Sequence, residues 1–301
     1  MKASVVITTK NRKEELRVAL RSAFDQSAQP EVVVMDDGST DGTAEMVRGE
    51  FPKTVLHHFR DSKGYIVRRN EGAQLATGSV IFSIDDDAEF STAQVVEQVL
   101  QEFNHRRIGA VAIPYTEPRK DNVERQRAPE TSDIWVADAF IGTAHALRRD
   151  IFLKIAGYRE HLVHQGEERD FCIRLLSKGH VVRLGTSDSI QHFESPKRDY
   201  KRMDYYGRRN DVLFAWQNVP APWLLIHLAA TTVNGLRSAF AVRRFKEMSR
   251  GIFQGYGDCI THRYARVPIP NRIYQLNRRL KKDGPARLAD IEEILAPIPK
   301  T

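Results

Sequence analysis

The chain has 301 residues, of which 41% are hydrophobic and 28% are charged, enough to bury the core of a globular protein with one large domain or two smaller ones. Its two cysteines, Cys172 and Cys259, lie far apart and lack the spacing of a zinc site, which argues against zinc and disulfide frameworks and fits a reducing cytoplasm. The first residues run directly into a strand-like segment without the features of a signal peptide, so we expect no export.

The net charge of +7 is unevenly distributed along the chain. Residues 195–301 contain 20 Lys and Arg against 9 Asp and Glu, whereas residues 1–194 contain 26 against 30. Two interpretations of the basic part stay open: a solvated surface, or a contact surface for anionic lipid or an acidic acceptor. The second interpretation predicts a cytoplasmic protein that attaches peripherally to the inner face of a membrane. No nucleic-acid-binding signature accompanies the basic residues, so we expect no nucleic acid partner.

The first 115 residues alternate short β-branched runs with amphipathic segments. This pattern is typical of an α/β fold in which helices cover both faces of a mostly parallel sheet. The predicted strands are Ser4–Thr9, Val32–Met35, Thr54–His58, Val80–Ile84 and Ile108–Ile113, and the predicted helices are Arg12–Gln26, Thr43–Arg48, Ile66–Ala76 and Ala93–Asn104. We therefore expect a nucleotide-binding type of fold in this half.

Two of the predicted strands end in consecutive aspartates. The run Asp85–Asp87 follows Val80–Ile84, and the run Asp36–Ser39 follows Val32–Met35. Adjacent carboxylates at the end of a buried strand are costly unless a cation or several hydrogen-bond donors neutralise them. Because ligands bind outside the carboxyl ends of parallel strands, both runs are expected to face one crevice that holds a divalent metal ion.

The second half of the chain changes in character along its length. We expect a long loop at Pro114–Thr131, a loop leading into a helix at Gln165–Lys178, a strand at Val181–Leu184, helices at Tyr200–Trp216 and Trp223–Phe253, and an extended tail after Arg266 with one short helix near Ala286–Leu295. The second long helix has too many polar residues to span a bilayer. These features predict an α/β domain at 1–195, with halves at 1–115 and 116–195, and a helical, basic extension at 196–301.

Four sequence strings in order carry a family resemblance. They are SVVITTKNR, VVVMDDGSTDGT, KGYIVRRNEGAQLATGSVIFSIDDDAEF and GEERDFCIRLLSKGH. Together they resemble the inverting family 2 glycosyltransferases of the GT-A fold. The resemblance implies an α/β GT-A domain that binds a nucleoside diphosphate sugar and transfers its sugar to an acceptor hydroxyl.

The resemblance assigns several strand-end residues to nucleotide-sugar binding. Asp37 would accept the imide N–H of a uracil, and Thr8 and Lys10 would line the same pocket, Lys10 through its alkyl stem. The further residues of this set are Arg12, Arg69, Asp85 and Asp86. A capped turn is the alternative for Asp36 and Asp37, and a solvated helix face is the interpretation that we prefer for Arg68.

The same resemblance implies a metal site that contains Asp87, the last residue of the D-x-D element. Asp85 and His192 would complete the ligand set, His192 as neutral imidazole. Mn²⁺ or Mg²⁺ suits oxygen ligands and would neutralise the departing diphosphate. Two alternatives stay open: an acidic helix N-terminus for the aspartates and a structural or exposed role for the histidine.

Inversion requires a carboxylate that removes the proton of the acceptor hydroxyl. The acidic candidates are Glu167, Glu168 and Asp170. The family's Glu-Asp pair falls on Glu167 and Glu168, which implies that Glu168 is the base, with glutamate in place of the usual aspartate, and Asp170 is the second choice. An acidic first turn of a core-facing helix is the alternative for both residues. Trp135 and Asp138 are predicted to contact the acceptor or sugar, although core packing explains Trp135 equally well.

These observations predict an enzyme that uses a metal ion and a nucleoside diphosphate sugar, with a UDP-sugar favoured over thymine or guanine nucleotides. The expected acceptor is a glycan or lipid-linked saccharide, as in polysaccharide synthesis. A sugar-nucleotide nucleotidyltransferase is the alternative enzyme, but the segment VVITTKNRKEE lacks its glycine-rich phosphate loop. A phospho-acceptor receiver domain of about 120 residues would leave most of the chain unexplained, whereas a transferase-like scaffold without activity stays open.

Overall fold

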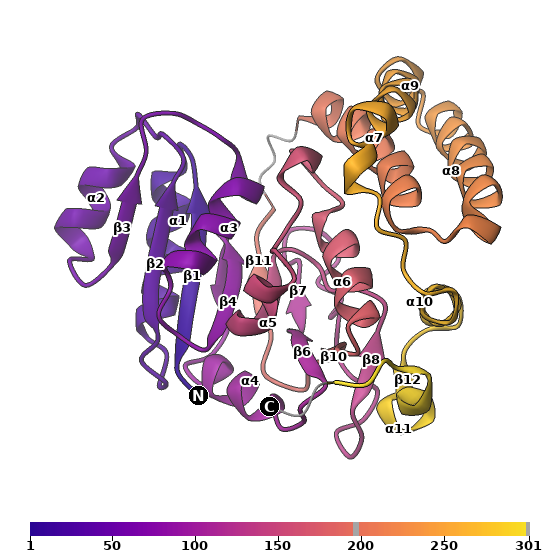
Figure 1. Ribbon diagram of the computed structural model, residues 1–301. Coiled ribbons are helices and arrows are strands. Elements are labelled where there is room, and N and C mark those ends of the chain that lie inside the picture. Colours follow the sequence, from indigo (N-terminus) through magenta and orange to yellow (C-terminus); the bar gives the residue numbers. More distant parts are fainter. Residues whose placement is uncertain (195–198, 299–301) are drawn as a thin grey trace.

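The computed structural model describes residues 1–194 and 199–298, and its centre is a nine-stranded sheet (Figure 1). All of its strands run in one direction except β8 and β9. Across the sheet the order is β12 (Ala286–Arg287), β8 (Trp135–Ala137), β10 (Val181–Leu184), β6 (Ile108–Ala112), β9 (Ala144–Arg148), β4 (Val80–Asp85), β1 (Ala3–Thr9), β2 (Glu31–Asp36) and β3 (Val55–His58). The expected α/β architecture with a mostly parallel sheet is confirmed.

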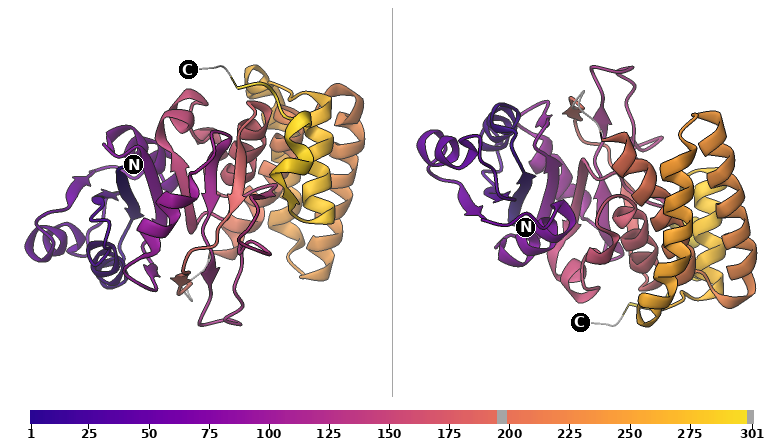
Figure 2. Two further views of the ribbon diagram at one scale, coloured as in Figure 1. Left: turned by 90° about the horizontal axis from the view of Figure 1, so that it is seen from below. Right: turned by 90° about the horizontal axis from the view of Figure 1, so that it is seen from above.

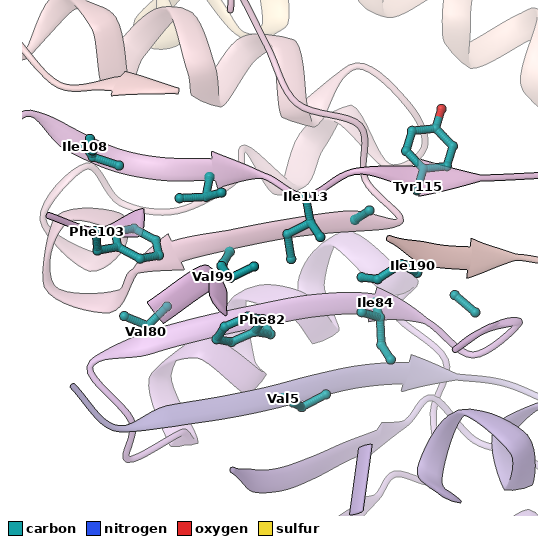
Figure 3. Close-up of a cluster of buried hydrophobic side chains, with 14 of the residues drawn as sticks. Val5, Val80, Phe82, Ile84, Val99, Phe103, Ile108, Ile113, Tyr115 and Ile190 are labelled. Carbon is teal, nitrogen blue, oxygen red and sulfur yellow. The ribbon is translucent and has the colours of Figure 1, made fainter. Parts of the chain in front are cut away.

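Helices cover both faces of this sheet, because its central strands are apolar on both sides. Val5 and Ile7 of β1 pack in one hydrophobic cluster, whereas Val6 packs in the other. Figure 3 shows part of the first cluster, where Val5 lies near Phe82 and Ile84. The helices before the bundle are α1 (Lys13–Phe24), α2 (Thr43–Glu50), α3 (Tyr65–Leu75), α4 (Val95–Glu102), α5 (Arg149–Lys154), η1 (Glu160–Leu162) and α6 (Glu167–Ser177).

A second, three-stranded sheet lies next to the acidic end of β4. It consists of β5 (Ala88–Phe90), β11 (Ile190–His192) and β7 (Tyr115–Thr116), in that order. The pairing of β11 with β5 places His192 opposite Ala88, the residue that follows the aspartate run. This small sheet therefore joins two segments about a hundred residues apart in sequence.

Three long helices form a bundle beside the sheet domain: α7 (Tyr200–Asn218), α8 (Ala221–Ala241) and α9 (Phe245–Thr261) (Figures 1 and 2). The expectation of one helix over Trp223–Phe253 is wrong, because the chain turns between α8 and α9. Arg243 has a positive φ of 54°, a conformation that no right-handed helix contains. Within residues 1–194 and 199–298, no helix combines the length and the apolar character needed to cross a bilayer.

The tail after the bundle is more structured than expected. It contains η2 (Arg263–Ala265), α10 (Asn271–Asp283), α11 (Leu288–Ile291) and η3 (Glu292–Ile294). The extended conformation predicted from the prolines of the tail is wrong for α10, since Pro270 precedes its first turn, where a missing N–H costs nothing. The tail then returns to the main sheet, where β12 pairs with β8. The predicted boundary between residues 195 and 196 lies outside the described residues.

Candidate active site

A cleft of about 880 Å³ opens at the carboxyl ends of β1, β2 and β4. The parallel register places Thr8 beside Asp85 on one side and beside Met35 on the other, so the two acidic strand ends flank the end of β1. The cleft is lined by Thr8, Lys10, Arg12, Asp37, Arg69, Asp85, Asp86, Asp87, Glu168 and His192 among the residues that the sequence singled out. The tertiary structure thus brings residues as far apart in sequence as Thr8 and His192 into one cleft.

The middle aspartate of the run points inward. Asp86 is 6% exposed, accepts a hydrogen bond of 2.7 Å from Thr9 Oγ1 and pairs with Arg12 Nη1 at 3.0 Å. Burial raises its pKa to about 7, because the attraction of Arg12 only partly offsets the loss of hydration. Thr9 was not recognised from the sequence, where an alternating strand pattern only says that it faces away from Thr8.

The outer two aspartates form a group with His192. One ligand atom from each of Asp85, Asp87 and His192 lies within 4.8 Å of the others. Asp87 Oδ1 is 3.3 Å from His192 Nε2, and its Oδ2 is 2.7 Å from Arg12 Nη1. Burial by itself raises the pKa of Asp87, but its bonds to His192 and Arg12 hold that pKa below the ordinary value. Asp87 is therefore a carboxylate at neutral pH.

The residues present fit a hard divalent cation. Two carboxylates and an imidazole are an ordinary donor set for Mn²⁺, and the carboxylates also suit Mg²⁺. His192 contacts Asp87 through Nε2, whereas its Nδ1 is buried without a hydrogen-bond partner among the described residues and lies 3.8 Å from Glu117 Oε1. A second group of ligand atoms, from Glu117, His192 and Glu194, adjoins the first.

Asp37 is held by four donors from the segment after β3. Ser62 Oγ and the backbone N–H groups of Lys63 and Gly64 donate to it at 2.6 to 2.9 Å, and Arg68 Nε donates at 2.7 Å. Burial raises the pKa of Asp37, but these bonds lower it below the ordinary value. A carboxylate offers about four acceptor positions, so an imide N–H would have to displace one of these donors.

Arg68 does not lie on a solvated helix face, and that interpretation is wrong. Its side chain is 1% exposed, it also donates to the Asp61 carbonyl at 2.6 Å, and its guanidinium lies 3.5 Å from the centre of the Phe59 ring. The neighbouring Asp36 is fully buried and accepts a hydrogen bond from the Ser39 N–H. This contact is the one expected of a residue that caps a turn.

Arg69 connects the aspartate run to the start of α6. Its Nη2 donates to Asp85 at 2.6 Å, and its Nη1 is 3.2 Å from Glu167. Glu167 is fully buried and accepts from the Tyr65 hydroxyl at 3.2 Å. Burial and the nearby charge of Glu168 raise the pKa of Glu167 well above its usual range. Neither Tyr65 nor Glu167 is recognisable from the sequence as part of this hydrogen-bond network; the adjacent glutamates in GEERD were the available signal.

The two candidates for the base lie in different environments. Glu168 lines the cleft, and its carboxylate lies so close to Gly142 that a side chain at that position would clash with it. Asp170 is 1% exposed and is bonded to Arg159, Arg174 and Asn218 at 2.7 to 2.9 Å. Asp170 is not among the residues that line the cleft. The geometry therefore favours Glu168.

The two residues predicted to contact the acceptor are not in this cleft. Trp135 lies on β8 and packs against the second hydrophobic cluster. Asp138 follows β8 and lines a separate cavity between α6, α7, α8 and α10. The structure does not bring either residue to Glu168, and any contact with the acceptor would have to be made away from the reacting hydroxyl.

Comparisons with known proteins identify a matching family and several relatives. The protein-family model described as Glycosyl transferase family 2 matches residues 4–159. The uncharacterized glycosyltransferase YwdF of Bacillus subtilis is 27% identical over 71% of this chain and 82% of its own length. The glucosyl-dolichyl phosphate glucuronosyltransferase of Haloferax volcanii is 24% identical over 72% of this chain and 75% of its own.

Two solved structures share the fold. The mannosyltransferase PcManGT from Pyrobaculum calidifontis, in complex with GDP-Man and Mn²⁺, has a TM-score of 0.59 and 18% identity, covering 86% of this chain and 87% of its own. The S. aureus TarS 1-349 structure, in complex with UDP-GlcNAc, has a TM-score of 0.66 and 16% identity, covering 98% and 88% respectively. At this identity the likeness concerns the fold, including the helical C-terminal part.

Proposed function

Since this chain belongs to glycosyl transferase family 2 and is a glycosyltransferase of the GT-A fold, we propose that it moves one sugar, with inversion, from a nucleoside diphosphate sugar to an acceptor hydroxyl. One observation carries this proposal: Asp85, Asp87 and His192 line the same cleft as the carboxylate of Glu168. The leaving diphosphate needs the positive charge of a metal ion, which Asp85, Asp87 and His192 can hold. The attacking hydroxyl needs a base, which is the carboxylate of Glu168.

The donor is a UDP-sugar held by the residues at the strand ends. Thr8, Lys10 and Asp37 form the base pocket, and Arg12 and Arg69 contribute positive charge beside it. The likeness to TarS with bound UDP-GlcNAc supports uracil, whereas PcManGT with GDP-Man shows that guanine suits the same fold. Thr8 is half-buried and Lys10 is exposed, so both can be reached by a ligand that enters from solvent.

Asp85, Asp87 and His192 hold the cofactor, Mn²⁺ or Mg²⁺. When bound, such an ion supplies positive charge that stabilises the leaving diphosphate. The Mn²⁺ in the PcManGT complex supports this assignment. Arg12 already lies on Asp86 and Asp87, and a guanidinium in this place can also bond to phosphate oxygens.

Glu168 is the general base. Its carboxylate accepts the proton of the acceptor hydroxyl while the hydroxyl oxygen forms a bond to the anomeric carbon and the bond to the diphosphate breaks on the opposite face. Asp170 is unsuited to this step, because Arg159, Arg174 and Asn218 occupy its oxygens. Arg69 bonds to Glu167, directly before Glu168, and so helps to fix the start of α6.

The acceptor is a glycan or lipid-linked saccharide of polysaccharide synthesis, and the enzyme works on the inner face of a membrane. Residues 195–301 contain 20 basic and 9 acidic residues, and this excess of positive charge supports electrostatic attachment to anionic lipid. Apolar side chains on α8 and α9 add to this surface, with Leu225, Phe240 and Phe253 each at least 70% exposed. Lys197 and Arg198, part of the predicted basic surface, lie outside the described residues.

This function assigns catalysis to residues 1–195, with a nucleotide-sugar half at 1–115 and an acceptor half at 116–195, and acceptor or membrane contact to the extension at 196–301. The bundle of α7, α8 and α9 supports a separate extension. The return of β12 to the main sheet ties the end of this extension to the catalytic domain.

The experiment that tests this function is a thermal-shift panel of nucleoside diphosphates and their sugars with Mn²⁺, followed by turnover assays with the stabilising donors. Binding to the native state raises the melting temperature. We expect UDP and a UDP-sugar to stabilise the protein only in the presence of Mn²⁺, and we expect the donor to be consumed. Binding without any donor turnover would favour a scaffold, and release of pyrophosphate from a nucleoside triphosphate would favour a nucleotidyltransferase.

A further inference from the structure

A second cavity, of about 740 Å³, lies on the other side of α6 from the site described above. It is open to solvent on one side and is lined by α6, α7, α8 and α10, and in Figure 1 α10 lies beneath the bundle of the other three long helices. We call it the basic groove and define it by Arg169, Arg208, Trp223, Tyr274, Arg278 and Lys281. Its volume is in the usual range for a small-ligand site.

The basic groove has an excess of positive charge. Its lining includes six Lys and Arg side chains but only two carboxylates, those of Asp138 and Asp211. Asp211 pairs with Arg169 at 2.9 Å and with Arg208 at 3.2 Å. In the part of the chain that the structure describes, no carboxylate forms an ion pair with the four cations of α10 in this lining, which are Arg278, Arg279, Lys281 and Lys282, although Asp138 lies near enough to Lys281 for an electrostatic attraction.

A neighbouring histidine lies in the field of these cations. Burial, together with smaller contributions from the charges of Arg169, Arg278 and Lys281, lowers the pKa of His227 to about 4. His227 is therefore neutral at pH 7 and adds no charge of its own. An anion that entered the groove would meet the cations of α10 and the guanidinium of Arg169, which shares the single carboxylate of Asp211 with Arg208.

The groove also has the side chains that bind sugar rings. Trp223 and Tyr274 are both within 5.9 Å of the Arg278 guanidinium, measured to the ring centres, and aromatic faces stack on pyranose rings. Asn234 and Gln275 line the groove with exposed amides, which can donate to and accept from hydroxyl groups. Cations, aromatic rings and amides together match a charged sugar better than a simple inorganic anion.

One helix connects the groove with the reaction. Glu168 lines the catalytic cleft, and the next residue, Arg169, lines the groove. Arg169 Nε is buried without a hydrogen-bond partner among the described residues, although the same guanidinium pairs with Asp211. Asp138, which the sequence placed at the acceptor, lines the groove as well. A ligand in the groove would thus touch the helix that carries the base.

We propose that the basic groove binds a negatively charged saccharide segment of the acceptor, at a distance from the hydroxyl that reacts. The segment contains sugar units with carboxylate or phosphate groups, which pair with the cations of α10 and with Arg169, while a sugar ring lies against Trp223. This inference rests on the proposed function, since it extends the acceptor site of the same enzyme.

The test is a direct binding measurement on the full chain without donor. The probe is a tetrasaccharide of alternating glucuronic acid and N-acetylglucosamine, measured by calorimetry at about 0.15 M salt, where the Debye length is about 8 Å. We expect its carboxyl-reduced, neutral form to bind at least about tenfold more weakly, and we expect the same loss in the variant Arg278→Glu/Lys281→Glu. Trp223→Leu should weaken both the charged and the neutral probe, because it removes ring stacking and no charge.

The matched control is Arg272→Glu/Lys246→Glu, which makes the same charge change at exposed positions outside the groove. Its affinity for the charged probe should stay within about twofold of that of the unchanged protein, because exposed charges beyond a Debye length are screened. Equal binding of the neutral and charged probes would overturn the proposal, and so would equal losses in the control and groove variants. Binding of tripolyphosphate but not of the tetrasaccharide would also overturn it.

The proposed function is tested separately by UDP and Mn²⁺ binding in the same preparations. The groove variants should keep this binding, since none of their residues lines the catalytic cleft. Failure of UDP to bind the unchanged protein would count against the proposed function and leave the saccharide measurement interpretable.

Discussion

Asp170→Asn should reduce the stability of the protein far more than its catalytic rate. The Asp170 carboxylate is 1% exposed and accepts from Arg159 Nη1 at 2.7 Å, from Arg174 Nε at 2.9 Å and from Asn218 Nδ2 at 2.8 Å. The amide keeps the shape but loses the charge, and it turns an N–H₂ group toward one of these donors. Both arginines are then left largely buried without a counter-charge.

The size of this loss of stability follows from the burial of the ion pairs that Asp170 forms with Arg159 and Arg174. Breaking a buried ion pair by changing one partner costs about 3–5 kcal/mol, because the other charge stays desolvated. Arg159 and Arg174 have side chains that are only 14% and 13% exposed, so solvent offsets little of this cost. We expect the free energy of unfolding, measured by urea denaturation at pH 7, to fall by an amount in this range.

The loss of stability in Asp170→Asn should depend on pH. Burial by itself raises the pKa of Asp170, but the charges of Arg174 and Arg159 and the bond from Asn218 hold it below the ordinary value. A lowered pKa in the folded state means that the carboxylate stabilises the fold above the unfolded-state pKa of about 3.9, and that this stability is lost as the pH falls through the folded-state value. Asparagine does not titrate. The difference in the free energy of unfolding between the unchanged protein and Asp170→Asn should therefore become smaller below about pH 4.

Asp25→Asn is the matched control, since Asp25 is exposed at the end of α1 and should change stability by no more than about 0.5 kcal/mol. Transfer by folded Asp170→Asn, measured at low temperature, should stay within a few-fold of the unchanged enzyme. A variant that keeps its stability and loses transfer would refute this reasoning and make Asp170 the base.

Four further outcomes are expected. Asp87→Ala should abolish Mn²⁺-assisted UDP binding in calorimetry without changing the circular dichroism spectrum, and unchanged binding would remove Asp87 from the metal site. Glu168→Gln should keep donor binding and lose transfer by roughly 10²-fold or more, the scale of a lost general base; normal transfer would exclude Glu168 as the base. Arg68→Met should cost about 3 kcal/mol in urea unfolding because it leaves Asp37 buried without its cation, whereas the exposed Arg48→Met should cost little. Sedimentation with vesicles should show salt-sensitive binding to anionic but not neutral lipid, each basic residue near the surface adding about 1 kcal/mol; equal binding to both, or none at low salt, would leave only a solvated surface.

Local pattern predicted much of the catalytic half, because the strand and helix periods are properties of neighbouring residues. The predicted strand Ser4–Thr9 lies within β1, and Val80–Ile84 lies within β4. The pattern failed where conformation depends on a distant contact. The strand β5 forms only because β11 pairs with it, and α10 packs on α6, although the prolines around it predict extended chain.

The sequence pattern was enough to predict that acidic residues end two strands of a mostly parallel sheet, that Glu168 and Asp170 begin a helix, and that the chain belongs with the family 2 glycosyltransferases. Which of these side chains face the cleft depends on the tertiary structure. Neighbours on a helix point about 100° apart, so residues two apart point in nearly opposite directions, and packing decides which of them meets solvent. Asn218, 48 positions away, holds Asp170 inside the fold, while Glu168 remains at the cleft.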